Sequence, residues 1–326
     1  MSRIVSLGPA QQEIYLIDRD DFEGLEIEGQ SIFGKMVIGT EVDIDKAHFG
    51  VGGSGANAAV TFARHAHETI YLGNLAHDPA GESVLECFDA ENIDTSYISF
   101  TRGTTGCSVI LLDAKSNDRT VLNFRGASAH TANLSSADLD TIQPDWLYAS
   151  TLMGDMRKLL DFFEKAHALG AKVMFSPGPA ELRQPQKLIG LLDDVDVLVL
   201  NKEEAAQLVP GVLLTELLAH LANYCETVLI TDGIMGAIAT NRRETYRLGV
   251  YEQARLRDSS GIGDAFGSGF LAEFAASNDF AKALQFAAAN ATHVAKAYGA
   301  MTGILTGEED LHLMPIQKVE DLAGWT

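Results

Sequence analysis

A glycine-rich segment ahead of a helical pattern holds the residues best suited to catalysis. Gly261 and Gly263 lead into an apolar stripe at helical spacing, and Asp264 stands in the first turn of the expected helix. Bare backbone N–H groups and the positive end of the helix dipole together predict an anion pocket, typically for phosphate. A carboxylate beside that pocket suits a base that deprotonates a nucleophile attacking the phosphate. The alternative is an ordinary helix start with a favourable acid.

The amino-acid sequence of this segment resembles a family signature. Residues 258–266 read Asp-Ser-Ser-Gly-Ile-Gly-Asp-Ala-Phe. The string is similar to the second signature of the ribokinase-like sugar kinases, the phosphofructokinase-B type, with two serines in place of threonines and an isoleucine in place of an alanine. The resemblance implies a base, Asp264, and a backbone anion hole formed by Gly261, Ile262 and Gly263.

A second glycine-rich segment contains a literal G-x-G-x-x-G, from Gly50 through Gly52 to Gly55. A dinucleotide-binding fingerprint follows the first core strand and is trailed about 20 residues later by an acid at a strand end. Here the motif follows polar, strand-like segments, and the next strand runs into Gly73 and Asn74 without such an acid. The pattern therefore argues against dinucleotide binding.

The same segment resembles the first ribokinase-like signature, a double glycine followed by Gly-Ala-Asn and an alanine-rich helix. The resemblance implies that Gly52, Gly53 and Asn57 contact acceptor hydroxyls. Backbone without side chains lets a sugar ring approach closely, and an amide can both donate to and accept from a hydroxyl. Ser54 stands where ribokinases often carry lysine, which disfavours a phosphorylated acceptor.

Shorter matches concern ATP and a metal ion. Asn201 and Glu204 follow an expected buried strand and fit either a helix capping box or the family's Asn-x-x-Glu motif. In the second case Asn201 binds ATP and Glu204 helps to place Mg²⁺, a hard cation that prefers oxygen ligands. The resemblance also implies ATP contacts at Thr231, Gly233, Gly236 and Asn290. A plain hairpin turn and an ordinary helix-interior asparagine are the alternatives for these positions.

The acceptor end of the site departs from the family pattern. Glu13 stands where the family usually has an aspartate that contacts the acceptor, and Arg125 is expected either to face the acceptor or to be a surface arginine. An acidic contact that ribokinases supply near residue 150 is missing, since Ser150 stands there, so ribose itself is not expected. A neutral hexose and a nucleoside both stay open. A nucleoside would need a stacking aromatic, Tyr15 or Phe124.

The elements that must position these residues alternate between strand and helix. Apolar runs and helical patterns predict strands at 146–150, 172–176, 195–200 and 227–231, and helices at 156–168, 202–208, 213–224, 264–277 and 280–298. This order predicts an α/β, ribokinase-like fold with a mostly parallel central sheet and helices on both faces. We expect the α/β catalytic domain to comprise 1–12, 51–100 and 130–326, and a small β-sheet lid to comprise 13–50 and 101–129.

The composition of the chain limits which classes of binding partner are expected. The chain has 326 residues and a formal net charge of −21, which argues against nucleic acid because phosphate backbones require a basic surface. No apolar run reaches the length of a membrane span, and the N-terminus lacks a signal-peptide layout. Three widely spaced cysteines show neither metal nor disulfide spacing, so a cytoplasmic location is expected. An exposed lid sheet would suit a homodimer.

Taken with the resemblance, these features predict an ATP-dependent kinase that transfers the γ-phosphoryl group to a hydroxyl of a small sugar. ATP and Mg²⁺ are the implied cofactors, and a monovalent cation, K⁺, is left open. One alternative is a nucleoside kinase of the adenosine type. The other is a non-catalytic sugar sensor on the same fold, which loss of the base or of the glycines would favour.

Overall fold

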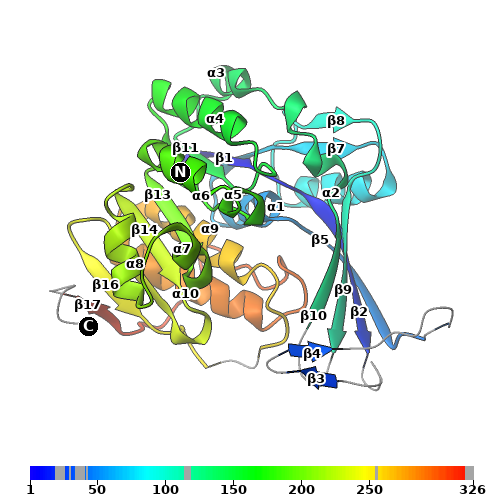
Figure 1. The fold of residues 1–326 in the computed structure, drawn as a ribbon. Helices are drawn as coiled ribbons and strands as arrows, with labels where there is room; N and C mark the ends of the chain where they lie inside the picture. The colour runs from blue at the N-terminus through cyan, green and yellow to red at the C-terminus, as the bar shows by residue number, and fades with distance from the viewer. Residues whose placement is uncertain are drawn as a thin grey trace.

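The computed structural model describes residues 1–18, 26–28, 31–33, 41, 43–113, 119–253 and 256–319. In this part of the chain the largest sheet has nine strands in the order β17-β16-β15-β14-β13-β12-β11-β1-β6 (Figure 1). The strands from β14 to β6 run parallel, and β15, β16 and β17 add antiparallel to one edge. Their bounds are β1 (Arg3–Leu7), β6 (Glu68–Leu72), β11 (Trp146–Ala149), β12 (Lys172–Phe175), β13 (Val197–Asn201), β14 (Thr227–Thr231), β15 (Ala237–Thr240), β16 (Thr245–Leu248) and β17 (Ile316–Lys318).

Helices cover both faces of this sheet (Figure 1). One face carries α3 (Leu139–Ile142), α4 (Met156–Ala168), α6 (Pro185–Leu191), α7 (Lys202–Leu208) and α8 (Leu214–Leu221), and the other carries α1 (Ser54–Arg64), α9 (Ile262–Ser277) and α10 (Phe280–Ala295). The remaining helices and 3₁₀ turns are α2 (Pro79–Ala90), α5 (Pro179–Leu182), η1 (Gly126–Ala129), η2 (Thr131–Asn133), η3 (Ser136–Asp138), η4 (Leu192–Asp194) and η5 (Gly233–Met235).

Strand β13 shows why the sequence forms a doubly covered sheet. Successive side chains of a strand point to opposite faces. Leu198 and Leu200 join the core cluster under α4, α7 and α8, whereas Val197 and Val199 join the cluster under α9 and α10. An apolar run without alternation is therefore what a strand buried on both faces requires.

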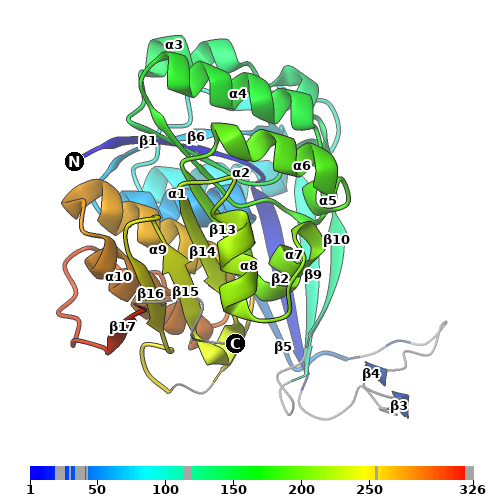
Figure 2. The ribbon, with the colours of Figure 1, turned by 60° about the vertical axis from the view of Figure 1, so that its left-hand side comes forward.

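A second sheet stands away from the main body and is called the lid sheet here (Figure 2). Its order is β10-β9-β2-β5, built from β2 (Gln11–Asp18), β5 (Lys46–Gly52), β9 (Gly106–Asp113) and β10 (Arg119–Phe124). Strand β2 follows β1 after the short link Gly8–Ala10, so the lid sheet is joined directly to the main sheet through β1, which lies next to the edge strand β6. Two small sheets pair β3 (Glu26–Glu28) with β4 (Ser31–Phe33) and β7 (Asn74–Ala76) with β8 (Ser99–Thr101).

The expected α/β fold with a separate small sheet is confirmed, and the differences concern boundaries. Strand β2 begins at Gln11, ahead of the expected start at residue 13, because its first residues pair with both β5 and β9. Within the part of the expected lid at 13–50 that the structure describes, strands occupy Gln11–Asp18, Glu26–Glu28, Ser31–Phe33 and Lys46–Gly52.

Two helices are shorter than expected. The one expected over 213–224 spans Leu214–Leu221, and the one expected over 280–298 stops at Ala295. Strands β7, β8 and β17 were not expected from the sequence. Within the described residues, none of the helices has both the length and the apolar character that crossing a membrane requires.

Candidate active site

A cavity of about 350 Å³ lies where the lid sheet meets the carboxyl ends of the main strands. Ligands of open α/β sheets gather at this edge. The lid contributes Glu13, and the last residues of β13 and β14 are Asn201 and Thr231, which also line the cavity. The start of α9 contributes Gly263 and Asp264. The cavity therefore joins the two glycine-rich segments with the shorter motifs.

Asn57 holds Asp264 at the cavity. It lies on α1, the helix that follows the second glycine-rich segment. Asn57 Nδ2 donates to Asp264 Oδ2 at 2.8 Å, and Asn57 itself is 4% exposed. Burial raises the pKa of Asp264 to about 6, although the hydrogen bond from Asn57 opposes this rise. Within the described residues Asp264 Oδ1 and the buried Asn57 Oδ1 have no hydrogen-bond partner. Two acceptor oxygens are thus available side by side at the cavity.

The raised pKa of Asp264 predicts how activity depends on pH. Only the deprotonated carboxylate can accept a proton, so kcat/KM should rise with pH to a plateau, with a midpoint at about 6. Below the midpoint the loss should approach about tenfold per pH unit. Asn57→Ala should move the midpoint upward, because it removes a hydrogen bond that favours the charged form. Initial rates from pH 5 to 8 would measure both, and a midpoint that Asn57→Ala leaves in place would contradict the assignment.

The amino end of α9 opens into the same cavity. Gly261 caps the helix in the left-handed region, with φ at +71°, and a Cβ there would lie 2.5 Å from the Ala300 side chain. The first N–H groups of a helix have no partner within it. Here they belong to Ile262, Gly263 and Asp264, whereas Ala265 N already donates to Gly261 O. The turn therefore points free N–H donors toward the cavity, as an anion site requires.

Glu13 forms the lid side of the cavity and is 7% exposed. Tyr15 Oη donates to Glu13 Oε2 at 2.8 Å. Burial raises the pKa of Glu13, with a further rise from the Asp258 and Asp264 carboxylates, while the hydrogen bond from Tyr15 lowers it. A Cβ at Gly52 would lie 2.2 Å from the Glu13 carboxyl group, so a larger residue there would force this carboxyl group to move.

The structure brings most of the expected acceptor residues together. Gly53, Asn57 and Arg125 line the cavity with Glu13, and Gly52 lies directly behind the Glu13 carboxyl group. The Arg125 side chain is exposed and has no partner within the described residues. Both interpretations of Arg125 hold in part, because it is at once a surface residue and a cavity residue.

Asn201 and Glu204 form a capping box and also line the cavity. Glu204 N donates to Asn201 Oδ1 at 2.8 Å, and Asn201 N donates to Glu204 Oε2 at 2.9 Å. Burial raises the pKa of Glu204. Because Glu204 Oε1 keeps no protein partner in the described residues, one oxygen remains for a ligand. Within the described residues there is no group of three or more His, Cys, Asp or Glu that could hold a metal ion.

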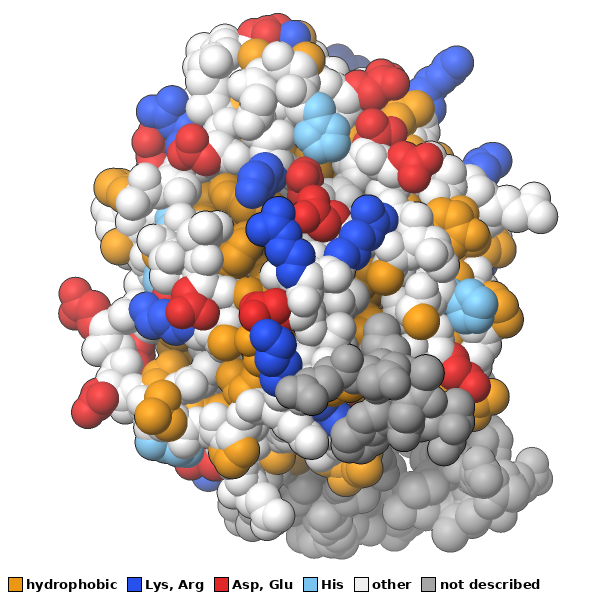
Figure 3. Space-filling view, turned by 90° about the vertical axis from the view of Figure 1, so that its left-hand side faces the viewer, with side chains coloured by type: hydrophobic (Ala, Val, Ile, Leu, Met, Phe, Trp, Pro, Cys, Tyr) orange, Lys and Arg blue, Asp and Glu red, His pale blue; other side chains and the backbone are white. Residues whose placement is uncertain are grey.

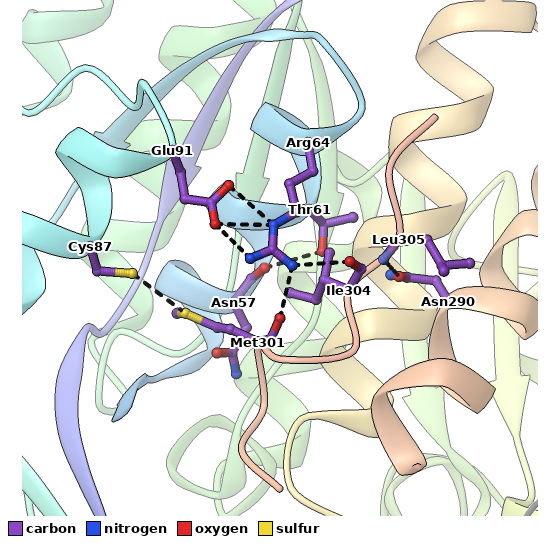
Figure 4. Close-up of polar contacts among 9 residues, drawn as sticks. All are labelled: Asn57, Thr61, Arg64, Cys87, Glu91, Asn290, Met301, Ile304 and Leu305. Atoms are coloured by element: carbon purple, nitrogen blue, oxygen red, sulfur yellow. Dashed lines mark hydrogen bonds and ion pairs between the residues drawn. The ribbon is translucent and has the colours of Figure 1, made fainter. Parts of the chain in front are cut away.

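Three residues expected at the ATP end lie outside the cavity lining. Gly233 and Gly236 begin and follow η5, with φ of +53° and +89°. A Cβ at Gly236 would lie 2.0 Å from Leu248 O, so this glycine is required by the turn itself. Asn290 is fully buried, and its Nδ2 donates to Ala265 O at 2.9 Å. Its Oδ1 accepts from Leu305 N, also at 2.9 Å (Figure 4). Both polar atoms of the Asn290 amide thus tie α9 and the loop at Leu305 to α10.

Figure 4 shows how α1 and α10 hold the loop that packs beside the anion pocket. Arg64 donates through Nη1 to Met301 O and to Ile304 O, each at 3.0 Å, and through Nε to Glu91 at 3.0 Å. Together with Asn290, Arg64 fixes residues 300–305. Since Ala300 packs against Gly261, this framework supports the turn into α9.

The model of the pfkB family carbohydrate kinases matches residues 35–306, which is most of the chain. This chain is a pfkB-family carbohydrate kinase. It is therefore a phosphotransferase with an alcohol group as acceptor, and the family resemblance noted in the sequence is confirmed.

The proteins similar to this chain include both ribokinases and a nucleoside kinase. A ribokinase from Staphylococcus aureus (strain COL) is 29% identical over 269 residues, covering 79% of this kinase and 86% of the relative. The crystal structures of the Methanocaldococcus jannaschii nucleoside kinase and of Arabidopsis thaliana ribokinase each have a TM-score of 0.76 at 20% identity. Each comparison covers 94% of this chain and 96% of the other. These likenesses confirm the ribokinase fold and leave the acceptor open.

Sequence patterns missed several residues of this pfkB-family kinase that line the cavity. Ser108 and Arg119 come from lid strands, and Thr151 and Ser176 follow β11 and β12. All four are single polar residues at strand ends or on alternating strand positions. The available signal was the strand end itself, because loops at the carboxyl edge of a parallel sheet converge on the ligand.

Proposed function

We propose that this kinase transfers the γ-phosphoryl group of ATP to a hydroxyl of a small sugar. The observation that carries the proposal is the hydrogen bond between Asn57 and Asp264, which holds the Asp264 carboxylate at the start of α9. Its second oxygen has no partner among the residues that the structure describes. An acid at an anion pocket is unfavourable for binding phosphate alone, since like charges repel. It becomes useful when the carboxylate takes a proton from the attacking hydroxyl.

The chain's own residues account for the proposed steps. The acceptor hydroxyl donates to Asp264 Oδ1 and lies within reach of Asn57 Oδ1, the two oxygens without protein partners. As the hydroxyl oxygen bonds to the γ-phosphorus, the bond from that phosphorus to the β,γ-bridging oxygen breaks, ADP leaves with the bridging oxygen, and the hydroxyl proton passes to Asp264. The N–H groups of Gly261, Ile262 and Gly263 face the negative charge on the transferred phosphoryl group. The lid sheet keeps bulk water from the reacting atoms.

ATP and Mg²⁺ complete the proposal. The Arabidopsis thaliana ribokinase was solved with ribose and ATP, which supports ATP as donor. Asn201 and Thr231 at the cavity, with the turn at Gly233 and Gly236, are proposed to lie along the phosphates. Glu204 would hold Mg²⁺ directly or through water, and the bound ion would neutralise phosphate charge. Asn290 would act through the framework described above.

A panel of sugars, polyols and nucleosides, each with ATP and Mg²⁺, tests the proposal through ADP release. Wild type should phosphorylate one sugar class, and Asp264→Ala should not. If the two proteins turn over alike on every acceptor, the kinase assignment fails and the sugar sensor takes its place. Repeating the assay with K⁺ replaced by Na⁺ tests the monovalent cation that the family resemblance leaves open.

A sugar is favoured over a nucleoside by the surroundings of Glu13. A nucleoside acceptor needs an aromatic side chain on which its base can stack. Neither of the two expected residues, Tyr15 and Phe124, lines the cavity. Tyr15 is fully buried and bonded to Glu13, and Phe124 is 56% exposed on a strand position that points away from the cavity. Among the described residues that line the cavity there is no aromatic side chain. Nucleosides stay in the panel of acceptors because the fold also resembles that of the Methanocaldococcus jannaschii nucleoside kinase.

Glu13→Gln is expected to raise the acceptor KM by roughly 10–100-fold, because a hydrogen bond to a charged group contributes about 1.5–3 kcal/mol. The amide keeps the size of the carboxyl group, so the fit against Gly52 is preserved. The KM for ATP should stay nearly unchanged, which separates acceptor binding from a general loss of structure. Steady-state kinetics in both substrates would measure this, and an unchanged acceptor KM would remove Glu13 from the acceptor site.

The outer face of the lid sheet supports a homodimer. Alternation along the strands places Glu13, Tyr15 and Ile17 inward, where they are buried, and the intervening residues outward. The outward set is almost entirely apolar: Ile14, Leu16, Ala47, Phe49, Val51, Cys107, Val109, Leu111, Leu122 and Phe124. Phe49 and Leu122 are 64% and 56% exposed, which is unusual for large apolar side chains gathered on one sheet.

Leu122→Glu is therefore expected to convert a dimer into a monomer, because it places a charge in the apolar face that a second copy would cover. Light scattering after size-exclusion chromatography measures the mass directly. Leu313→Glu, at an exposed apolar residue outside the lid, is the control and should leave the dimer intact. A wild-type monomer, or an equal response of both variants, would rule out a lid dimer.

Charge and cysteine chemistry support a cytoplasmic protein without a nucleic-acid or membrane partner. The net charge is −21. On the described part of the face in Figure 3, acidic, basic and apolar side chains are interspersed. Cys87, Cys107 and Cys225 are free thiols, as a reducing compartment favours.

A further inference from the structure

Arg119 connects the lid sheet to the segment that leads into the anion pocket. It is the first residue of β10, and its side chain points inward with those of Val121 and Asn123, which also line the cavity. Arg119 Nη1 lies 3.2 Å from Asp258 Oδ1 and also donates to the Ser259 hydroxyl. The contact spans 139 residues of chain and joins the lid sheet to the loop before α9.

Asp258 in turn organises the backbone on both sides of the pocket. Its side chain is 1% exposed, Oδ1 accepts from Ser260 N at 2.8 Å, and Oδ2 accepts from Gly299 N at 3.2 Å. One carboxylate thus ties the turn before α9 to the loop that Arg64 and Asn290 hold. Gly261 follows Asp258 three residues later and packs against Ala300, the neighbour of Gly299.

The buried Asp258 carboxylate needs the positive charge of Arg119 beside it. A carboxylate taken out of water is costly unless a cation and hydrogen bonds compensate it. The carboxylate of Glu13 faces this corner as well, and it and Asp258 repel one another. Arg119 is the cation that bonds to Asp258 within the described residues. If the lid sheet moved away, the carboxylate would lose that cation and the turn would lose one of its anchors.

We propose that Arg119 is a positioning residue that makes the geometry of the anion pocket depend on the placement of the lid sheet. With the lid seated, the Arg119–Asp258 ion pair fixes residues 258–261 and aligns the N–H groups at the start of α9. With the lid displaced, these groups lose their alignment and phosphoryl transfer slows. The catalytic part of this proposal rests on the proposed kinase function. It gives a physical reason for ATP to react only when an acceptor lies under the lid.

Hydrogen exchange of the backbone amides tests the coupling without any substrate. Arg119→Met should speed exchange in the peptide that contains residues 259–265, and Arg119→Lys, which keeps the cation, should restore part of the protection. Arg102→Met removes an exposed arginine without a partner in the described residues and should exchange like wild type. Thermal unfolding shows whether each variant folds. Unchanged exchange at 259–265 in folded Arg119→Met would overturn the proposal.

Steady-state kinetics provide a second test of the role of Arg119. Arg119→Met should lower kcat by roughly 10–100-fold, in the range of the loss of one buried charge pair, with a smaller change in the KM for ATP. Asp258→Asn should lower kcat similarly, and the double variant should be no worse than either single one. Additive losses would overturn the coupling. If wild type phosphorylates no acceptor, the proposed function fails, and the exchange experiment still decides whether Arg119 positions the pocket.

Discussion

Asp264→Asn is expected to lower kcat for acceptor phosphorylation by roughly 10²–10⁴-fold, the range that general base catalysis supplies. The substitution keeps the size of the side chain and an oxygen that can accept from Asn57 Nδ2, and it removes only the ability to take a proton. The KM values should change little. Stability should hold or increase, because burial raises the pKa of Asp264 to about 6 and so makes its charged form costly in the folded protein at neutral pH.

Single-turnover rates and thermal unfolding of the same sample would measure both effects. Asp89→Asn is the matched control, since it removes an exposed carboxylate on α2 that has no partner within the described residues. It should leave the rate unchanged. A fully active Asp264→Asn enzyme would show that the base is another group, and a loss of rate together with a loss of folding would contradict the stability argument.

Gly263→Ala is expected to abolish most activity while leaving the fold intact. Gly263 lies in α9 and lines the cavity, and an added Cβ meets no protein atom within 4 Å. The methyl group would enter the space proposed for the transferred phosphoryl group and mask a neighbouring N–H donor. Loss of one such donor typically lowers kcat by about 10²–10³-fold. Stability should rise by up to about 1 kcal/mol, because alanine has the better helix propensity.

Gly190→Ala provides the comparison for this variant. Gly190 is an exposed glycine in α6 with open space around it, so alanine there should add stability without changing kcat. Equal activity of the two variants would mean that no phosphate approaches Gly263. Gly261→Ala would not serve as well, because its φ of +71° and its contact with Ala300 would mix strain with loss of function.

The main sheet could be predicted because its signals are local. The apolar run of β13 is what burial on both faces requires, and the glycines before α9 mark a helix start in any context. Lid boundaries were less accurate because β2 pairs with strands far along the chain, which decide where it begins. Strand β17 gave no local signal, since it is three residues long and is fixed by pairing with β16.

A site role is hardest to predict where one residue type allows two roles. Asn290 matched a family position near adenine, yet its amide is used to hold Ala265 and Leu305. Asn201 and Glu204 showed that two roles can coexist, because the capping box leaves one carboxylate oxygen at the cavity. Arg119 was missed because its partner, Asp258, lies 139 residues away. Only the folded chain shows that a lid strand reaches the turn before α9.

The order of strands in the lid sheet has a consequence for synthesis on the ribosome. Strand β2 is translated almost first, yet it lies between β5 and β9, and its parallel neighbour β9 begins only at Gly106. Until that segment leaves the exit tunnel, β2 has an unsatisfied backbone edge and apolar side chains exposed to water. Such a nascent segment is prone to aggregate and is a natural target for chaperones. Slow translation before residue 113 would therefore lower the yield of native protein more than the same pause placed after it.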